Sequence, residues 1–599
     1  MSGVNDFAFK MATVNGTGSA SANGLLMQAI FRMGIPVSGK NIFPSNIQGL
    51  PTWYEIRVSR DGYTARPEAI DLVVALNTST YDRDVAAVRP GGYLVYDSSW
   101  PLDPELVRDD ITILGVPFGH LCVENFEGDR PRTLLRNIVY TGTLAALLDI
   151  DMDVVSEMLR EKFSKKKSLL DANFRAIALG HEYAVRNFQC PLPFHLERMS
   201  ATSDAIVIDG NTAAALGAVY AGATVGAWYP ITPSTSLMEG YKMFCERFRV
   251  NKETGERNYA MIQAEDELAA AGMVIGAGWA GARAFTSTAG PGISLMEEFI
   301  GLAYYAEVPA VFFDVQRTGP STGMPTRTQQ GDLMAVAYAS HGDTKHIALF
   351  PSDPAECFYM ARDAFDLAER YQTPVFVLSD LDIGMNDWMV PRLVWDDAYV
   401  PDRGKVLTAE DLERVKSFAR YIDVDGDGIA ARTLPGVHPK GAYFTRGSGH
   451  DKNGAYTEDA DAYQEVVDRI ARKIAGAATA VPAPEIRRRP GAEIGLVSIG
   501  GCHAAMLEAV DRLQAQGIPA DYMRIRGFPF DAPVADFLNE HDIVFVVEQN
   551  RDAQLRAMLT IETGVPRDHM IPILDYGGLP LTAQRVVSAV TAHLQGAVA

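Results

Sequence analysis

Short apolar runs alternate with longer stretches of helical periodicity along most of this chain of 599 residues. In the first part, apolar runs predict strands, and a helix follows the first of them and ends at Gly34. Helical patterns continue to about Phe188, and residues 189–202, with two prolines, form a candidate linker. The predicted strands here are Phe7–Val14, Asp71–Leu76, Tyr93–Tyr96 and Ile111–Val116. The alternation predicts an α/β domain over residues 1–190.

The middle of the chain, residues 203–390, shows the most regular alternation. Its helical patterns cover Gly210–Ala221, Glu267–Gly281 and Ser294–Ala306. Between and after them lie the predicted strands Thr224–Tyr229, Ala260–Ala264, Ala284–Ser287, Ala310–Val315, His346–Phe350 and Pro374–Leu378. Strands that alternate with helices in this way predict a doubly wound parallel sheet.

Residues 391–485 are polar and rich in turn formers, which indicates a wrapping connector and linker. The linker ends in the basic run 487–489, flanked by prolines, which we expect to be solvated. Residues 486–599 return to the α/β pattern, with strands predicted at Ile494–Ile499, Tyr522–Ile525, Ile543–Glu548 and Ile571–Leu574. The chain is therefore expected to be an α/β protein with three α/β domains.

Composition and charge narrow the function classes. The formal net charge of -21 argues against nucleic acid or an anionic membrane as a partner, because both require a basic surface. The five cysteines are far apart in the sequence with no C-x-x-C pair, which argues against an iron–sulfur cluster or zinc site built from this chain alone. The beginning of the chain lacks a secretory signal, and the uncharged runs are too interrupted or too short to span a membrane. We expect a cytoplasmic protein.

Candidate chemistry gathers at the carboxyl ends of the middle strands, which meet at one edge of a parallel sheet. The features there are the turn at Thr232, the acidic run 265–267, the turn 290–292 and the loop from Arg317 to Thr326. An arginine with threonines on Gly/Pro-rich turns suits a carboxylate or oxo-acid, and a glutamate suits a proton relay. Simpler interpretations remain open: a capped turn at Thr232, a dipole-favoured helix acid at Glu267, and a surface arginine at Arg317.

The first glycine-rich turn contains Gly16, Gly18 and Ser21, in the pattern G-x-G-x-x-S. This pattern departs from the dinucleotide fingerprint at its third glycine, and no acidic residue follows at the ribose position. NAD is therefore disfavoured, although the loop could hold another phosphate.

Three stretches of the chain, TVGAWYPITPSTSLME, QAEDELAAAGMVIGAGWAGARAFTSTAGPGISLMEE and VQRTGPSTGMPTRTQQGDL, resemble the alpha subunit of the 2-oxoacid:ferredoxin oxidoreductases in order and spacing. The resemblance is strong over about residues 204–400 and moderate in the last domain. The first domain resembles the gamma domain of that family, fused in front of alpha. This arrangement is most similar to 2-oxoglutarate:ferredoxin oxidoreductases of the gamma–alpha fusion type.

The resemblance implies a fold, a reaction and site residues. The central domain would be of the pyrimidine-binding type of thiamine-diphosphate enzymes, and the last would be transketolase-C-like. The complex would convert 2-oxoglutarate and coenzyme A to succinyl-CoA and CO2 with reduction of ferredoxin, or run in reverse. Thr232, Arg317 and Thr326 would bind the 2-oxoacid. Glu267 would be the catalytic acid that faces N1′ of the cofactor, with Glu265 as the competing assignment.

The resemblance also implies a partner. Mg²⁺, the diphosphate site and [4Fe-4S] would lie in a separate beta subunit, in an (alpha-beta)2 heterotetramer, with ferredoxin docking on beta. Coenzyme A would bind near the first domain, for which Gly16, Gly18, Ser45 and Asn46 are candidates. This chain holds one decoy for the diphosphate motif, Gly426-Asp427-Gly428 with Asn453. The same stretch begins like an EF-hand loop at Asp423 but has Leu434 where the loop needs glutamate, so a tight acidic turn is expected and no metal site is assigned.

Three alternatives remain open. The chain could act on another 2-oxoacid, such as pyruvate or a branched-chain or aryl acid, because the same threonines and arginine would serve. It could be a non-catalytic scaffold subunit of an electron-transfer complex. An NAD-dependent dehydrogenase is the third alternative.

Overall fold

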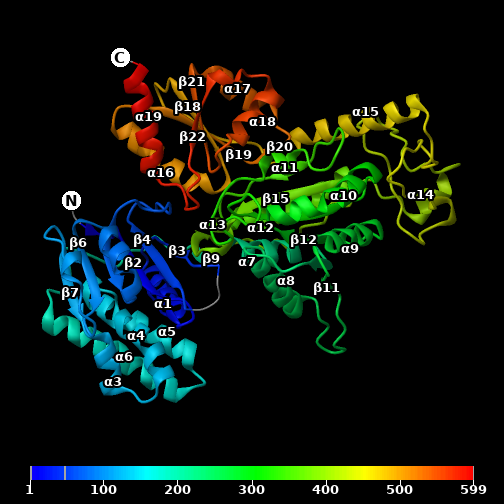
Figure 1. Ribbon diagram of the computed structural model, residues 1–599. Coiled ribbons are helices and arrows are strands. Elements are labelled where there is room, and N and C mark those ends of the chain that lie inside the picture. Colours follow the sequence, from blue (N-terminus) through cyan, green and yellow to red (C-terminus); the bar gives the residue numbers. More distant parts are fainter. Residues whose placement is uncertain (1–2, 46–48, 598–599) are drawn as a thin grey trace. The chain divides into compact units, whose positions relative to one another are not determined.

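The computed structural model describes residues 3–45 and 49–597. They form two compact units (Figure 1), which are treated separately below. The first contains residues 1–208 with two short later segments, and the second contains most of residues 209–599. In the described part of the chain, none of the helices combines the length and apolarity needed to cross a bilayer.

The first unit is built on a six-stranded sheet in the order β3-β4-β2-β5-β6-β7. Its strands are β2 (Asp6–Val14), β3 (Val37–Ile42), β4 (Pro51–Ser59), β5 (Ile70–Ala75), β6 (Val88–Asp97) and β7 (Thr112–Val116). The helices are α1 (Ser19–Arg32), α2 (Tyr81–Ala87), α3 (Phe118–Asn125), α4 (Asp129–Leu148), α5 (Met152–Phe163) and α6 (Lys167–Asn187). Short ladders join β1 (Gly3–Val4) to β8 (Phe194–His195), inside the stretch predicted as a linker, and β9 (Ala205–Ile208) to β16 (Trp388–Pro391).

The antiparallel strands β3 and β4 were not predicted, because charged residues interrupt their apolar pattern. Glu55 of β4 is 1% exposed, and it pairs with Lys10 at 3.4 Å and with Arg66 at 2.8 Å. Arg57, also buried, donates to the carbonyl of Ala65 at 2.9 Å. Such long-range pairing lets polar residues occupy an inner strand, and it is invisible in the local sequence.

The second unit contains a seven-stranded sheet in the order β11-β10-β12-β13-β15-β14-β20. All its pairings are parallel except β14 with β20. The strands are β10 (Val225–Trp228), β11 (Ala260–Gln263), β12 (Ala284–Thr288), β13 (Ala310–Gln316), β14 (Ile347–Leu349), β15 (Pro374–Asp380) and β20 (Gly527–Phe528). The helices are α7 (Gly210–Tyr220), α8 (Thr235–Phe248), α9 (Glu267–Trp279), α10 (Gly290–Ala306), α11 (Leu333–Ala337), α12 (Pro354–Tyr371) and α13 (Leu381–Met385).

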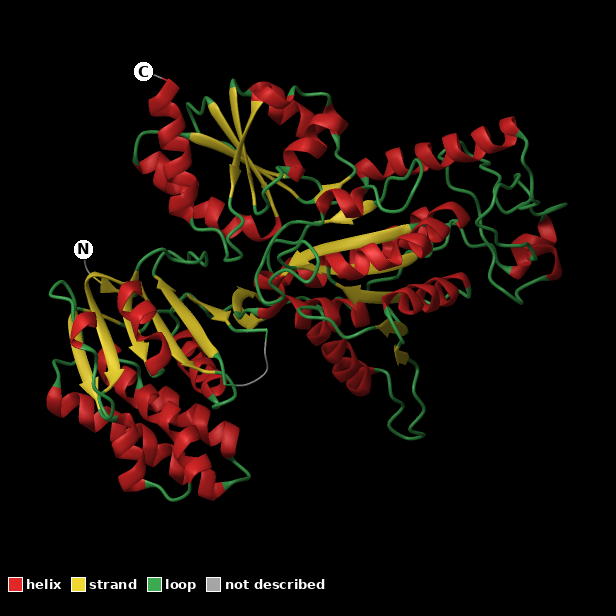
Figure 2. Ribbon diagram, viewed as in Figure 1, coloured by secondary structure: helices red, strands yellow, loops and turns green. Residues whose placement is uncertain are grey.

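The sheet is doubly wound, as predicted, because successive buried residues of each strand face opposite helix layers. Phe285 packs edge-to-face against Tyr241 of α8 and against Phe365 of α12. Phe312 faces the other way and belongs to the core that includes Ile300 of α10. Helices α7, α8 and α12 pack together, as do α9 and α10 (Figure 2).

The last part of the chain forms a five-stranded sheet in the order β17-β19-β18-β21-β22. Its strands are β17 (Glu485–Arg487), β18 (Ile494–Ile499), β19 (Ala520–Ile525), β21 (Ile543–Glu548) and β22 (Met570–Leu574). Its helices are α16 (His503–Ala515), α17 (Ala532–Glu540), α18 (Gln554–Thr563) and α19 (Ala583–Ala597). Strand β20 leaves this part and pairs with β14, so the seven-stranded sheet is completed by residues from the far end of the chain.

Two predictions for the connector and linker differ from the structure. The connector contains α14 (Ala409–Arg414) and the long α15 (Ala460–Gly476), which was missed. The basic run is not a solvated linker: β17 pairs with β19, and Arg488 bonds to Asp521 and Arg489 to Asp511. The four domain boundaries given above remain a proposal.

A buried ionic cluster ties α15 to the end of α10. Glu307, which follows α10 and is 1% exposed, accepts from Arg469 at 3.0 Å and from Lys473 at 2.8 Å. Burial favours the neutral acid, but Lys473 and Arg469 hold the pKa of Glu307 below its usual range. The cluster fixes the connector on the sheet domain.

We expect Glu307→Gln to destabilise the protein by about 3–5 kcal/mol, because it leaves two buried cations without their anion. Glu410→Gln, which breaks the exposed pair with Arg414, is the matched control and is expected to cost about 0.5 kcal/mol or less. Urea unfolding of both variants measures the difference. Equal midpoints would show that the cluster adds no stability.

Candidate functional site

The predicted chemistry lies at one edge of the seven-stranded sheet, where parallel strands β10, β11, β12 and β13 end. The turn 229–234 follows β10, and α9 follows β11 after a short segment. Helix α10 follows β12, and the loop 317–332 follows β13. The parallel topology therefore brings together four segments that are separated in sequence.

Arg317 connects two of these segments directly. Its Nη1 donates to the carbonyl oxygen of Thr232 at 2.6 Å, and the residue is only 8% exposed. Burial lowers the pKa of Arg317, whereas the charges of Asp332 and Glu267 raise it. The guanidinium is thus a half-desolvated cation between the turn at Thr232 and two acids, rather than an ordinary surface arginine.

The turn at Thr232 is closed by the next threonine. Thr235 accepts from the backbone N–H of Ile231 at 3.1 Å through its hydroxyl. Ser234, at the N-cap of α8, makes no side-chain capping bond, so the turn is closed by the Thr235 hydroxyl instead. The geometry places the Thr232 carbonyl toward Arg317.

Glu267 is the first residue of α9 and is 8% exposed, and Asp266 caps the helix by accepting from Ala269 N–H at 2.7 Å. A Cβ atom on Gly292 would lie 3.0 Å from Glu267 Cγ and 1.9 Å from Thr288 Oγ1, so only glycine fits there. In the described part of the chain, no hydrogen bond or salt bridge engages the Glu267 carboxyl group. Glu265 is exposed, which makes the two acids physically distinct.

Thr326 lies on the loop as predicted but is engaged by a residue that the sequence did not single out. Arg327 Nη1 donates to the Thr326 carbonyl at 2.7 Å and to its hydroxyl at 3.2 Å. Burial lowers the pKa of Arg327. The arginine in P-T-R-T was the available signal, and only the fold shows that it turns back onto its neighbour.

The loop is held from the other side by the C-terminal part of the same unit. Gln330 is 1% exposed, and its Nε2 donates to the carbonyl of Ile499 at 3.0 Å. Its Oε1 accepts from Gln549 N–H at 3.1 Å, and its carbonyl accepts from Asn550 Nδ2 at 3.1 Å. The ends of β18 and β21 therefore fix the loop that carries Arg317.

In the first unit, Gly16 and Gly18 both have positive φ, 84° and 86°, which favours glycine. The loop is closed by Asn137, whose Nδ2 donates to the carbonyl of Thr17 at 2.7 Å. Ser45 is exposed after β3, and Asn46 lies outside the described residues. The structure thus shows an ordered glycine turn at the start of α1.

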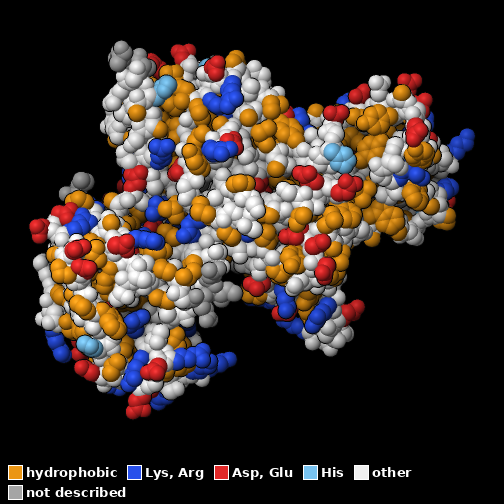
Figure 3. All heavy atoms as spheres, viewed as in Figure 1, with side chains coloured by type: hydrophobic (Ala, Val, Ile, Leu, Met, Phe, Trp, Pro, Cys, Tyr) orange, Lys and Arg blue, Asp and Glu red, His pale blue; other side chains and the backbone are white. Residues whose placement is uncertain are grey.

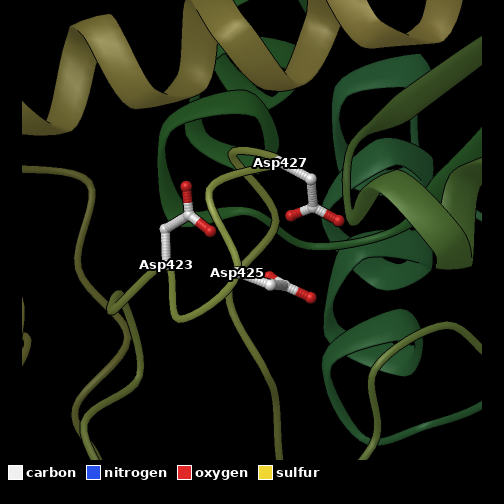
Figure 4. Close-up of side chains that lie close together, drawn as sticks. All are labelled: Asp423, Asp425 and Asp427. Carbon is white, nitrogen blue, oxygen red and sulfur yellow. The ribbon is translucent and has the colours of Figure 1, made fainter.

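The Asp-rich loop carries its own cation. Asp423, Asp425 and Asp427 lie close together on one loop (Figure 4). Lys405 Nζ donates to Asp425 at 2.6 Å and to Asp427 at 2.8 Å, and Asp423 accepts from Gly426 and Gly428 N–H groups. Lys405 therefore compensates part of the negative charge of this acidic turn.

A cavity of about 790 Å³ lies elsewhere in the second unit, between the end of α10, residues 340–344 and α15. It is lined by aromatic residues such as Tyr305 and Tyr463, and apolar side chains gather over the region of α14 and α15 (Figure 3). None of the predicted site residues is among the described residues that line it.

Comparisons with known proteins identify the family. A family model described as "Pyruvate flavodoxin/ferredoxin oxidoreductase, thiamine diP-bdg" matches residues 216–400, and one described as "Pyruvate ferredoxin/flavodoxin oxidoreductase" matches residues 8–183. The alpha subunit of 2-oxoacid:ferredoxin oxidoreductase 2 from Aeropyrum pernix is 30% identical over 98% of this chain and 98% of its own. This chain belongs to the 2-oxoacid:ferredoxin oxidoreductase alpha subunits.

Two further relatives of this alpha subunit have narrower names. A 2-oxoglutarate synthase subunit from Methanocaldococcus jannaschii is 35% identical over 57% of this chain and 88% of its own. The structure of 2-oxoglutarate:ferredoxin oxidoreductase from Magnetococcus marinus, with 2-oxoglutarate, coenzyme A and succinyl-CoA bound, superposes with a TM-score of 0.89. It is 28% identical, and the match covers 98% of this chain and 99% of that one. The predicted α/β fold with a thiamine-diphosphate-binding central domain is confirmed.

We expect Gln330→Ala in this alpha subunit to loosen the 317–332 loop, because it removes the side chain that joins the loop to Ile499 and Gln549. Hydrogen exchange of the loop amides in the purified complex is expected to accelerate by about tenfold, corresponding to a lost buried bond of roughly 1–2 kcal/mol. Gln514→Ala, at an exposed position of α16, is the control and should leave this exchange unchanged. Unaltered loop exchange in Gln330→Ala would refute the clamp.

Proposed function

We propose that this chain is the alpha subunit of a 2-oxoglutarate:ferredoxin oxidoreductase. The complex would convert 2-oxoglutarate and coenzyme A to succinyl-CoA and CO2, with the electrons passing to ferredoxin, and the reaction would be reversible. The observation that carries the proposal is the buried Arg317 at the sheet edge, held by the Thr232 carbonyl beside Glu267.

Arg317 and the threonines would bind the 2-oxoacid. A half-desolvated guanidinium attracts a carboxylate more strongly than an exposed one, because water screens it less. The hydroxyl groups of Thr232 and Thr326 would add donors, and a substrate carboxylate would complete the partners of Arg317. Binding would thus orient the acid at this edge and exclude water from it.

The residues around Glu267 fit the pyrimidine end of thiamine diphosphate. Glu267 is a mostly buried acid with no partner among the described residues, and the missing side chain of Gly292 lets the backbone of α10 lie directly against it. When bound, the cofactor supplies the nucleophilic carbon and the electron sink for decarboxylation of a 2-oxoacid. Glu267 would hold a proton at N1′ of the aminopyrimidine, the role for which a positioned carboxyl group is suited.

A second subunit would complete the site. Large apolar side chains are exposed on the segments that follow β10, β11, β12 and β13: Tyr229, Leu268, Leu295 and Met324. An exposed apolar rim favours a protein partner over open solvent. We place the diphosphate site, Mg²⁺ and [4Fe-4S] on this beta subunit, to which ferredoxin would dock, in an (alpha-beta)2 assembly. This division agrees with the cysteine spacing of the sequence, which has no C-x-x-C pair.

Coenzyme A would be bound with the help of the first unit. The turn at Gly16 and Gly18 precedes the N-terminus of α1, and such a terminus favours phosphate groups. Ser45 and Asn46 are further candidates for this co-substrate.

Another 2-oxoacid is the second candidate substrate. The Aeropyrum pernix relative carries only the general name of a 2-oxoacid enzyme, whereas the methanogen and Magnetococcus marinus proteins are named for 2-oxoglutarate. The names of the latter two proteins are the support for 2-oxoglutarate.

Viologen reduction by the purified native complex tests the proposal. We expect reduction that requires coenzyme A and prefers 2-oxoglutarate over pyruvate and 2-oxoisovalerate. A preference for another acid would support the proposed reaction but contradict the proposed substrate. No reduction with any acid, in a complex shown to hold thiamine diphosphate and iron, would overturn the proposed function.

Glu267→Gln is expected to lower turnover by about 10²–10⁴-fold, because the amide cannot exchange a proton with the aminopyrimidine. Glu265→Gln removes a charge from an exposed position and is expected to keep turnover within about threefold. Steady-state kinetics of the two complexes, each checked for bound thiamine diphosphate, measures the contrast. The reverse order of effects would assign the role to Glu265.

A further inference from the structure

Two aspartates, three residues before and fifteen residues after Arg317, are not used by the proposed reaction. Asp314 is on β13, opposite Thr288 of β12 and Leu378 of β15, and it is fully buried. Asp332 precedes α11, and its backbone N–H donates to the side chain of Gln316 at 3.1 Å. The last part of β13 and the end of its loop thus place two carboxyl groups together.

The two carboxyl groups are close enough for each to shift the pKa of the other. Both oxygens of Asp314 and Oδ2 of Asp332 are buried without a donor from any other described residue. A hydrogen bond between two carboxyl groups needs a proton, and two unpaired negative charges in contact inside a protein are strongly unfavourable. Buried carboxyl groups that lack other donors are therefore expected to hold at least one proton between them.

Arg317 is the charged group that faces this pair. The charges of Asp332 and of Glu267, at the start of α9, both raise the pKa of Arg317. Helix α10 contributes the uncharged Gly290, at which an added Cβ would lie 2.5 Å from Asp332 Oδ1. The charge on the aspartate pair therefore determines how strongly Arg317 attracts an incoming anion.

We propose that Asp314 and Asp332 share a proton, and that the pair takes up a second proton from water when a 2-oxoacid carboxylate binds at Arg317. The pair would be a charge-setting element that touches neither substrate nor cofactor. The substrate part of this inference rests on the proposed function. The shared proton does not.

The direction of the pH dependence follows from linkage. Burial raises the pKa of Asp314 well above its usual range, and that of Asp332 to about 6, while Arg317 opposes the second shift. A substrate carboxylate competes for Arg317 and raises the pKa of Asp332 further, so the bound state holds more protons. Binding is then tightest below pH 6, and KM rises with pH above about 6, by up to roughly tenfold per unit.

Two isosteric substitutions separate the states of the pair. In Asp332→Asn the position is neutral at every pH, and Asp314 keeps its proton, so KM should stay low and flat between pH 6 and 8. In Asp314→Asn the amide donates to Asp332 and stabilises its ionised form, so KM should stay high and flat. A purely structural role would impair both variants alike.

The first measurement is infrared difference spectroscopy of the purified complex. The wild-type minus Asp314→Asn spectrum is expected to show a band from the carbonyl stretch of a buried carboxylic acid. The wild-type minus Asp332→Asn spectrum is expected to lack this band, because Asp314 keeps its proton in that variant. Absence of the band from both spectra would overturn the shared proton, whatever the complex catalyses.

The second measurement is calorimetry with 2-hydroxyglutarate, which keeps both carboxylates but lacks the reacting carbonyl. Heats of binding in phosphate and Tris buffers give the protons taken up, and we expect uptake in wild type and none in either variant. Arg317→Ala is the discriminating control. Full turnover of that variant would overturn the substrate role of Arg317, whereas equal proton uptake in wild type and Asp332→Asn would overturn the coupling alone.

Discussion

One hydrogen bond, from the guanidinium of Arg317 to the carbonyl of Thr232, expresses the constraint on which the site depends. The two residues are 85 apart in the chain, and they meet because β10 and β13 are parallel strands of one sheet that end on the same side. Each strand delivers one connecting segment to this edge. The chemistry is therefore distributed over several turns, and none of them is a site by itself.

The strands fix where each turn begins, but not where the long loop after β13 goes. That loop is shaped from outside the sheet, by Gln330 and its contacts with the ends of β18 and β21. On the far side of the sheet domain, the buried cluster at Glu307 fixes α15 in the same way. The C-terminal part of the chain thus acts as the second wall of the loop.

Much of the fold could be predicted from periodicity, because the buried parallel strands are nearly continuous apolar runs. The strand at Ile494–Ile499 and the alternation of the middle domain were predicted in this way. Strands β3 and β4 could not be, because Glu55 and Arg57 are buried by pairing with distant residues that no local window contains. Helix α15 was not predicted, because the stretch before it is rich in turn-forming residues and the whole region was interpreted as a connector.

The residues of the candidate site also divide into those that the sequence could predict and those that it could not. Residue type and position after a strand were enough to single out Thr232, Glu267 and Arg317. The family resemblance supplied their expected roles, which no geometric observation tests. Arg327 and the pair Asp314–Asp332 were not found, because their significance lies in contacts across the loop. Nothing in the sequence distinguishes the aspartate of F-F-D-V from one that is exposed.

The presence of acidic residues near Arg317 is best understood as a consequence of anion binding by a buried cation. A lone guanidinium at the sheet edge would be costly to desolvate before substrate arrives, so the fold surrounds it with acids. Fully ionised acids would then compete with the carboxylate that the cation is there to bind. A pair of aspartates that shares a proton resolves this conflict, because its charge can change by one proton without movement of the backbone. The same low dielectric that makes an unpaired carboxylate unfavourable makes such a pair responsive to a charge arriving on the other side of Arg317.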